Sequence, residues 1–185
     1  MFCNVGVAEE ISIKDIKLGK KLTNYFTSNQ ISEFNYNNQG EFKEVYSYEK
    51  KYSIMIIKNS ILQNIYKESY DSVQIYYENQ NNKVVSVVGV NQNFDGKEGL
   101  KNCIKYRDEQ ISEYKKNKVI FHLEKHPVKR VIRENKISED SVWFKNNILK
   151  FDIGFLCYIY PNDRNNFRLD YSYQIFNKWV EEHNP

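Results

Sequence analysis

The chain of 185 residues contains few of the residues that build flexible or loop-rich proteins, with only seven Gly and three Pro. Disordered linkers and low-complexity segments are enriched in these residue types. The sequence also lacks any run of about 18 apolar residues, the length that a helix needs to span a bilayer. These shortages exclude a linker-rich chain and predict a protein without a membrane span.

The chain has no strong excess of one charge, since its formal net charge is +3. The two notable basic runs, residues 115–118 and 125–136, both have acidic residues close by. Nucleic-acid-binding proteins instead gather their cations on one face or stripe, where these neutralise phosphates. The charge pattern therefore predicts no nucleic-acid partner.

Aromatic residues, in contrast, are abundant at 15% of the chain, and they include fifteen Tyr. Each buried ring removes about 150–250 Å² from water, which supports a sizeable core. A chain of this length fits one domain. We expect this domain to span residues 9–185 and to consist of two halves, about 9–93 and 94–185.

The amino end indicates export. Gly6 and Ala8 before Glu9 resemble the end of a secretory cleavage site, although no basic start or apolar stretch precedes them. Residues 1–8 are therefore expected to be a signal-peptide remnant or a disordered terminus, and the protein to be periplasmic or secreted. An ordinary cytosolic amino terminus is the alternative.

Hydrophobic periodicity gives the same order of elements in both halves, one helix followed by four strands. An additional short strand is predicted at 10–18 and a closing helix at 174–183. The predicted helices are 19–30 and 97–117, and the predicted strands are 42–49, 52–58, 70–78, 83–92, 118–124, 141–145, 148–160 and 167–173. This order predicts an α+β fold, with antiparallel sheet(s) and helices packed on one face. The other face is then free for a partner.

Two of the three cysteines are predicted to face each other. Cys103 lies on the apolar stripe of the helix at 97–117, with Leu100, Ile104, Arg107 and Ile111 at helical spacing. Cys157 shares one strand face with Phe151, Ile153, Phe155 and Ile159. If that face is buried under the helix, a Cys103–Cys157 disulfide is within reach. Such a bond also favours an exported protein. Two inert buried thiols are the alternative.

Several stretches carry a resemblance to known proteins: EISIKDIKLGKKL, YDSVQIYYENQNNKVVSVVGV, NCIKYRDEQ and FLCYIYPNDRNNFRLDYSYQIFNKWV. They resemble a group of small, uncharacterised exported bacterial proteins from AT-rich genomes. The tandem order of a helix and four strands also resembles the beta-lactamase inhibitor protein architecture, an envelope-associated binding fold. The resemblance implies export and a role in binding, although fold alone does not fix function.

Residue patterns typical of catalysis or metal binding are missing. His122 and His126 are the first and last residues of HLEKH. On a strand, two residues four positions apart are separated by about 13 Å, which is too far for both to bind one metal ion. Both Cys103 and Cys157 lie on predicted core faces, which is unfavourable for a nucleophile. The sequence therefore predicts no catalytic residue, metal site or cofactor.

Tyrosine provides the remaining functional signal. Tyr158 and Tyr160 lie on the strand face opposite Cys157, and further Tyr residues extend this pattern at Tyr46, Tyr48, Tyr76 and Tyr171. Tyr is enriched at recognition surfaces because its stiff ring loses little entropy on binding. Alternatively, these rings simply shield a sheet.

The leading prediction is an exported, non-catalytic binding module whose exposed aromatic-polar sheet face contacts another protein or a small envelope ligand. One alternative is a small hydrolase with Asp and His residues in a cleft between the halves. Another is a structural envelope protein that binds copies of itself.

Overall fold

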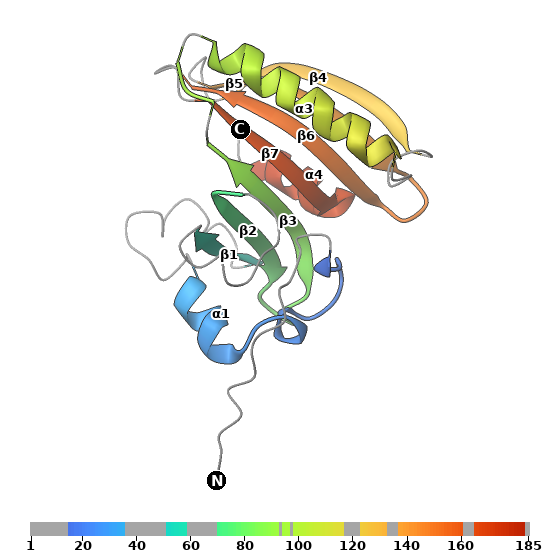
Figure 1. The fold of residues 1–185 in the computed structure, drawn as a ribbon. Helices are drawn as coiled ribbons and strands as arrows, with labels where there is room; N and C mark the ends of the chain where they lie inside the picture. Colours follow the sequence, from blue (N-terminus) through green and yellow to red (C-terminus); the bar gives the residue numbers. More distant parts are fainter. Residues whose placement is uncertain are drawn as a thin grey trace.

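The computed structural model describes residues 15–35, 51–58, 70–92, 94–96, 98–116, 123–132, 137–160 and 165–183. Within these ranges the strands form one seven-stranded antiparallel sheet in the order β1-β2-β3-β7-β6-β5-β4 (Figure 1). The strands are β1 (Tyr52–Lys58), β2 (Ser72–Glu78), β3 (Val84–Asn91), β4 (Glu124–Ile132), β5 (Ile137–Asn146), β6 (Phe151–Ile159) and β7 (Asn165–Tyr173). The helices are η2 (Leu22–Asn24), α1 (Ser28–Phe34), α3 (Gly99–Lys116) and α4 (Gln174–His183). The predicted α+β class with antiparallel strands and a C-terminal helix is confirmed.

The last strand of the chain joins the two halves into one sheet. β7 pairs with β6 on one side and with β3 on the other, where Ser172 lies opposite Ser86 and Phe167 opposite Asn91. The interval between β3 and β7 in the sequence holds α3 and the β4–β6 strands. Because of this pairing, side chains from both halves of the chain share each face of the sheet.

Local sequence explains where several elements begin and end. The helix predicted at 19–30 is instead a 3-10 turn at Leu22–Asn24 followed by α1, which starts later because Thr27 and Gln30 form a capping box. Residues 79–82, the gap between the predicted strands 70–78 and 83–92, connect the antiparallel strands β2 and β3, and Asn82 adopts the left-handed conformation with φ 56° that Asn tolerates.

Two other boundaries in the second half differ from expectation. The predicted strands 141–145 and 148–160 leave a gap at 146–147, whereas β5 and β6 are joined by residues 147–150. There the Asn146 side chain accepts hydrogen bonds from the backbone N–H groups of Ile148 and Leu149. The strand predicted at 118–124 is matched by β4 at Glu124–Ile132, which contains Pro127; β4 is an edge strand, where a missing N–H is tolerated. The predicted strand at 42–49 and residues 1–8 lie outside the described residues.

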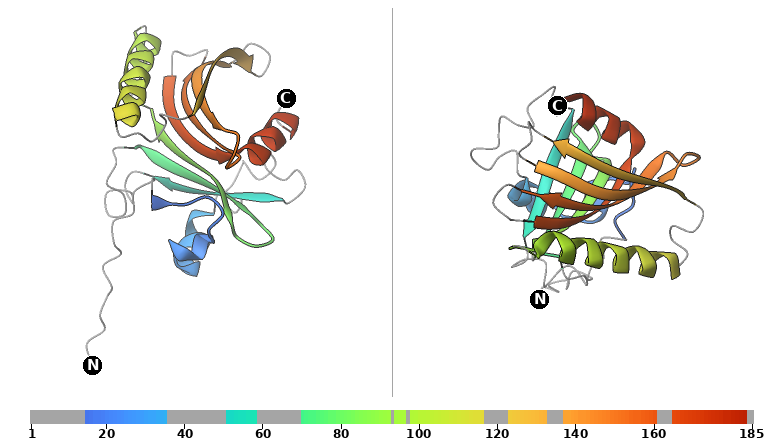
Figure 2. Two further views of the ribbon diagram at one scale, coloured as in Figure 1. Left: turned by 90° about the vertical axis from the view of Figure 1, so that its right-hand side faces the viewer. Right: turned by 90° about the horizontal axis from the view of Figure 1, so that it is seen from above.

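The sheet has two different faces. We call the side that bears Cys157 the α3 face and the opposite side the α4 face. Figure 2 shows strands β4–β7 curling as an arc, with α3 outside the arc and α4 on its inner side. The two helices were expected on one face. The structure places them on opposite faces, because the sheet has a separate apolar patch on each side.

The α3 face carries the main core. α3 packs on β6 and β7, where Tyr114 lies edge-on to Phe155 with ring centroids 5.2 Å apart. Leu22, Phe26 and Phe34 from the N-terminal segment join the same core together with residues of β1–β3. A continuous apolar face is thus removed from water, which is the dominant favourable term in folding.

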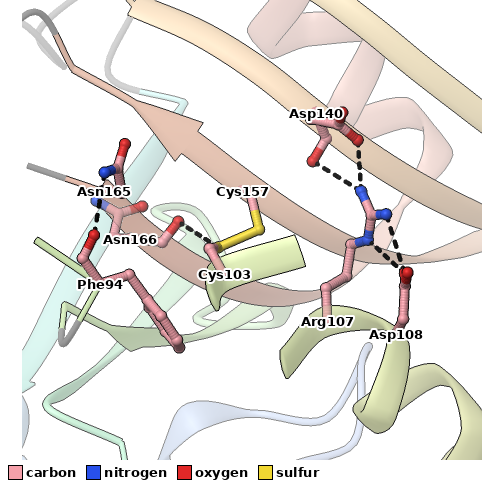
Figure 3. The surroundings of a disulfide bond; sticks show 8 residues. All are labelled: Phe94, Cys103, Arg107, Asp108, Asp140, Cys157, Asn165 and Asn166. Atoms are coloured by element: carbon pink, nitrogen blue, oxygen red, sulfur yellow. Dashed lines mark hydrogen bonds and ion pairs between the residues drawn. A yellow bond between two sulfur atoms is a disulfide. The ribbon is translucent and has the colours of Figure 1, made fainter. Parts of the chain in front are cut away.

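A disulfide joins α3 to β6 in this core (Figure 3). Cys103 and Cys157 are both 0% exposed, and their Cα atoms are 6.0 Å apart. One turn further along α3, the buried Arg107 forms ion pairs with Asp140 on β5 and with Asp108. The predicted pairing of the two cysteines is present, and Arg107 lies on the buried stripe as expected.

A smaller apolar cluster attaches α4 to the other face. Phe176 and Trp179 pack edge-on against Tyr52 of β1, at centroid distances of 5.1 and 4.9 Å, and Phe176 also contacts Tyr76 of β2. α4 is therefore held over the β1–β2 side of the sheet. Residues of α4 and of β4–β6 line a groove between them.

We expect replacement of both Cys103 and Cys157 by Ala to lower the free energy of unfolding by about 4 kcal/mol, because the bond closes a loop with a sequence separation of 54 residues. Urea unfolding followed by circular dichroism measures this loss. Both proteins carry Cys3→Ser, which removes the third thiol and so prevents disulfide exchange. The protein with Cys3→Ser alone is the matched control. Equal stability of the two proteins, or alkylation of every thiol without reductant, would contradict the expectation.

Candidate functional site

A groove of about 530 Å³ lies between α4 and the α4 face of β4–β6. Strand register places Asp152 beside Lys145 and Trp143 beside His126, so these side chains form its floor. Gln174, Asn177, Lys178 and Glu181 recur at helical spacing on α4 and form its wall. The remaining lining residues are Pro127, Val128 and Asn147.

Trp143 is the aromatic residue of the groove, and Gly154 determines its position. The two residues are paired across β5 and β6. A Cβ atom at position 154 would lie 2.7 Å from Cζ3 of Trp143 and 2.8 Å from Cδ1 of Leu156. Only glycine therefore allows the indole to lie against the backbone of β6, where it stays half-buried and lines the groove.

The first turn of α4 is tied to the floor by hydrogen bonds. The buried carboxylate of Asp152 accepts from Nε2 of Gln174 at 2.9 Å and from Nδ2 of Asn177 at 3.2 Å. Ser172 Oγ donates to Oδ1 of Asn177 at 2.8 Å, and the backbone N–H of Gln174 donates to the carbonyl of Lys150. These bonds fix the orientation of the Gln174 and Asn177 amide side chains at the wall of the groove.

Asp170 lies one strand away from Asp152 on the same face. Its Oδ1 accepts a hydrogen bond from Ser86 at 3.2 Å. Burial raises the pKa of Asp170 to about 6, and Asp152 adds to the rise, while hydrogen bonds from Ser172 and Ser86 and the charge of Arg168 oppose it. The α4 face therefore holds two neighbouring carboxylates, one of which titrates near neutral pH.

The charged side chains of the groove are balanced. Lys145 and Lys178 supply positive charge, and Asp152 and Glu181 supply negative charge. Nε2 of His126 lies 3.2 Å from the Glu124 carboxylate, and Lys178 lies 3.8 Å from Glu182. In the described part of the chain, no three His, Cys, Asp or Glu side chains come together in a way that would hold a metal ion.

The predicted tyrosines fall at several places. Tyr158 and Tyr160 are half-buried at the far end of the α4 face, where Arg168 lies over the Tyr158 ring at 4.7 Å and Asn166 donates to the Tyr160 hydroxyl. Tyr76 packs under α4 against Phe176. None of these three lines the groove.

Tyr171 lies on the other side of the sheet, near Tyr114 of α3. Alternation along β7 places it there with Phe167 and Leu169, so it shares no surface with Tyr158. Tyr46, Tyr48 and His122 lie outside the described residues. A binding role for the predicted tyrosines stays a prediction.

Sequence reasoning missed the groove itself. A signal was present in the segment 141–145, where Val142 and Phe144 alternate with Ser141, Trp143 and Lys145. A lone Trp on the polar face of such a strand could have drawn attention to this surface, because Trp is enriched at binding hot spots. The wall of the groove carried no such signal, since it depends on where α4 packs.

Comparison of the chain with protein-family models, curated proteins and solved structures finds no match. The resemblance to exported bacterial proteins and to the beta-lactamase inhibitor protein architecture therefore stays a prediction. Of the helices that the structure describes, none combines the length and apolar character needed to cross a bilayer.

We expect Gly154→Ala to lower the free energy of unfolding by about 1–3 kcal/mol, because the new methyl group overlaps the Trp143 ring. Chemical denaturation measures the loss. The double variant with Trp143→Ala tests the cause, since removing the ring should make its loss smaller than the sum of the two single losses. Strictly additive losses would show that the ring does not press on this position.

Asp170→Asn should remove a pH dependence of stability. The pKa of Asp170 is higher in the folded state than the ordinary value of 3.8, so the folded protein binds this proton more tightly. The resulting stabilisation is fully present below pH 3.8 and is lost as pH rises through about 6. Between about pH 4 and pH 7, we expect the unfolding free energy of the wild type, relative to Asp170→Asn, to fall by on the order of 2–3 kcal/mol. Parallel pH profiles of the two proteins would contradict this.

Proposed function

We propose that the protein is an exported binding protein that takes its ligand in the groove between α4 and β4–β6. The observation that carries this proposal is the half-buried Trp143, held against Gly154 in a groove of about 530 Å³ whose amide side chains are already oriented. Ligand pockets typically enclose about 300–1,000 Å³ and combine apolar surface with a few fixed polar groups. The groove meets both criteria.

Two features support the export and binding parts of the proposal. The buried Cys103–Cys157 bond favours an oxidising compartment, since the cytosol keeps such pairs reduced. Asp152 is 5% exposed and accepts hydrogen bonds from Gln174 and Asn177. These bonds hold two side chains of the groove in fixed positions, which supports a binding role because less entropy is lost when a ligand binds.

A second candidate function follows from the same groove. His126, Asp152 and Glu181 all line it, and a His beside carboxylates is a common arrangement for general acid–base catalysis. The groove would then belong to a small hydrolase. The site lies within the second half of the chain, whereas the sequence placed such a cleft between the halves.

Saturation-transfer NMR with a mixed library of saccharides, nucleotides, dipeptides and fatty acids tests the binding function. We expect a subset of molecules to receive saturation from the wild type and to be recovered chemically unchanged. Trp143→Ala should abolish the transfer, because Trp truncation at the centre of a site typically costs at least about 2 kcal/mol. Ile175→Ala is the matched control, since Ile175 is an apolar residue of α4 that is 67% exposed and does not line the groove.

Two results would overturn the proposal. Equal transfer to wild type and Trp143→Ala would place binding elsewhere. Conversion of a library member by the wild type, lost in His126→Gln, would establish the hydrolase.

A further inference from the structure

We infer that the ligand of the groove is a neutral saccharide. This inference rests on the proposed binding function and assigns the chemical class of the ligand. It follows from the charge balance of the lining, from the kind of hydrogen-bonding groups present, and from the placement of Trp143.

The charge balance disfavours a ligand with strong net charge. Lys145 and Lys178 line the same groove as Asp152 and Glu181. An anion attracted to the lysines is repelled by the carboxylates, and a cation meets the reverse arrangement. Phosphate-binding sites instead combine clustered Arg or Lys with oriented backbone N–H groups. A neutral polar molecule uses both kinds of charged group as hydrogen-bond donors and acceptors without this penalty.

The amide side chains match hydroxyl groups. An amide carries two N–H donors and a carbonyl oxygen with two acceptor sites, and a hydroxyl likewise donates and accepts. Asn177 donates one N–H to Asp152 and accepts one hydrogen bond from Ser172. The amide can therefore make one further hydrogen bond as a donor and one as an acceptor. Because both partners are fixed, the amide presents these sites in a defined direction. A polyhydroxylated ligand satisfies such mixed groups pairwise.

Trp143 supplies the apolar counterpart. A pyranose ring has hydroxyl groups at its edge and a patch of C–H bonds on its face, and such a patch packs well on an indole. The indole is held in place by its contact with Gly154, so little side-chain entropy is lost when a ligand packs on it. Trp143, Pro127 and Val128 are the apolar members of a lining that is otherwise polar or charged. An acyl chain would leave most of these polar groups without partners, which is costly.

The chain allows a direct test because it contains only two Trp residues. Trp179→Phe leaves Trp143 as the single indole and reports on the groove. Trp143→Phe is the matched control, since it leaves Trp179, which packs against Tyr52 and Phe176 beneath α4. Circular dichroism establishes that both variants are folded. The probes are maltotetraose, cellotetraose, mannotetraose and chitotetraose, compared with inorganic phosphate, glutamate, dialanine and octanoate.

We expect at least one oligosaccharide to shift the emission of the Trp143-only protein saturably, with a dissociation constant on the order of 10 μM to 1 mM. The Trp179-only protein should show no saturable shift. Lys145→Ala in the Trp143-only background should weaken binding by about tenfold, because one charge-assisted hydrogen bond is lost.

The outcomes separate the two proposals. A saturable shift with phosphate, glutamate, dialanine or octanoate, and with none of the oligosaccharides, would overturn the saccharide assignment and leave the binding function standing. No shift with any probe, together with no Trp143-dependent ligand in the NMR screen, would overturn both. A saccharide shift of equal size in the Trp179-only protein would place the sugar outside the groove and also overturn the assignment.

Discussion

The packing of α3 against β6 through Cys103 and Cys157 determines on which face of the sheet each strand side chain lies. Once Cys157 faces α3, alternation turns Asp152 and Gly154 to the opposite face. Strand register carries this choice to the neighbours, so that Lys145 stands beside Asp152 and Trp143 beside Gly154. A slip of one residue would exchange the two faces completely. Because side chains alternate along each strand, the residues buried in the core on one face determine which residues line the groove on the other face.

The position of α4 is the second constraint, and it explains why a groove exists at all. The apolar residues of α4 bury against Tyr52 and Tyr76, which lie on the β1–β2 side of the sheet. The α4 face of the curled β5 and β6 strands is mixed, since Trp143 and Leu156 alternate there with Ser141, Lys145 and Asp152. The helix is therefore anchored at one side by aromatic packing and at its first turn by hydrogen bonds to Asp152. Between these two anchors, the polar surface of the arc stays open.

Local patterns in the sequence predict the parts of this arrangement that depend on neighbouring residues. Helical spacing places Cys103 and Arg107 on the buried stripe of α3, and alternation separates Cys157 from Tyr158, as the structure shows. Long-range pairing is not encoded in this way. Tyr52 contacts Phe176, and β3 pairs with β7. Both contacts join residues far apart in the chain, and no local periodicity predicts them. The groove depends on both contacts. Tyr158 could therefore be assigned to a face from the sequence, whereas the groove that Trp143 lines could not be predicted.

The two faces also differ in energetic terms. The α3 face gains its free energy from apolar burial and from the covalent link, and its buried Arg107 is paired with Asp140. On the α4 face, burial raises the pKa of Asp170, with a smaller contribution from Asp152, so ionising this carboxyl group near neutral pH lowers stability. An uncharged residue at this position would not bear that cost, because desolvation penalises only the charged form of the carboxyl group. The apolar α3 face thus supplies most of the stabilisation, and the α4 face bears the cost of a buried carboxyl group.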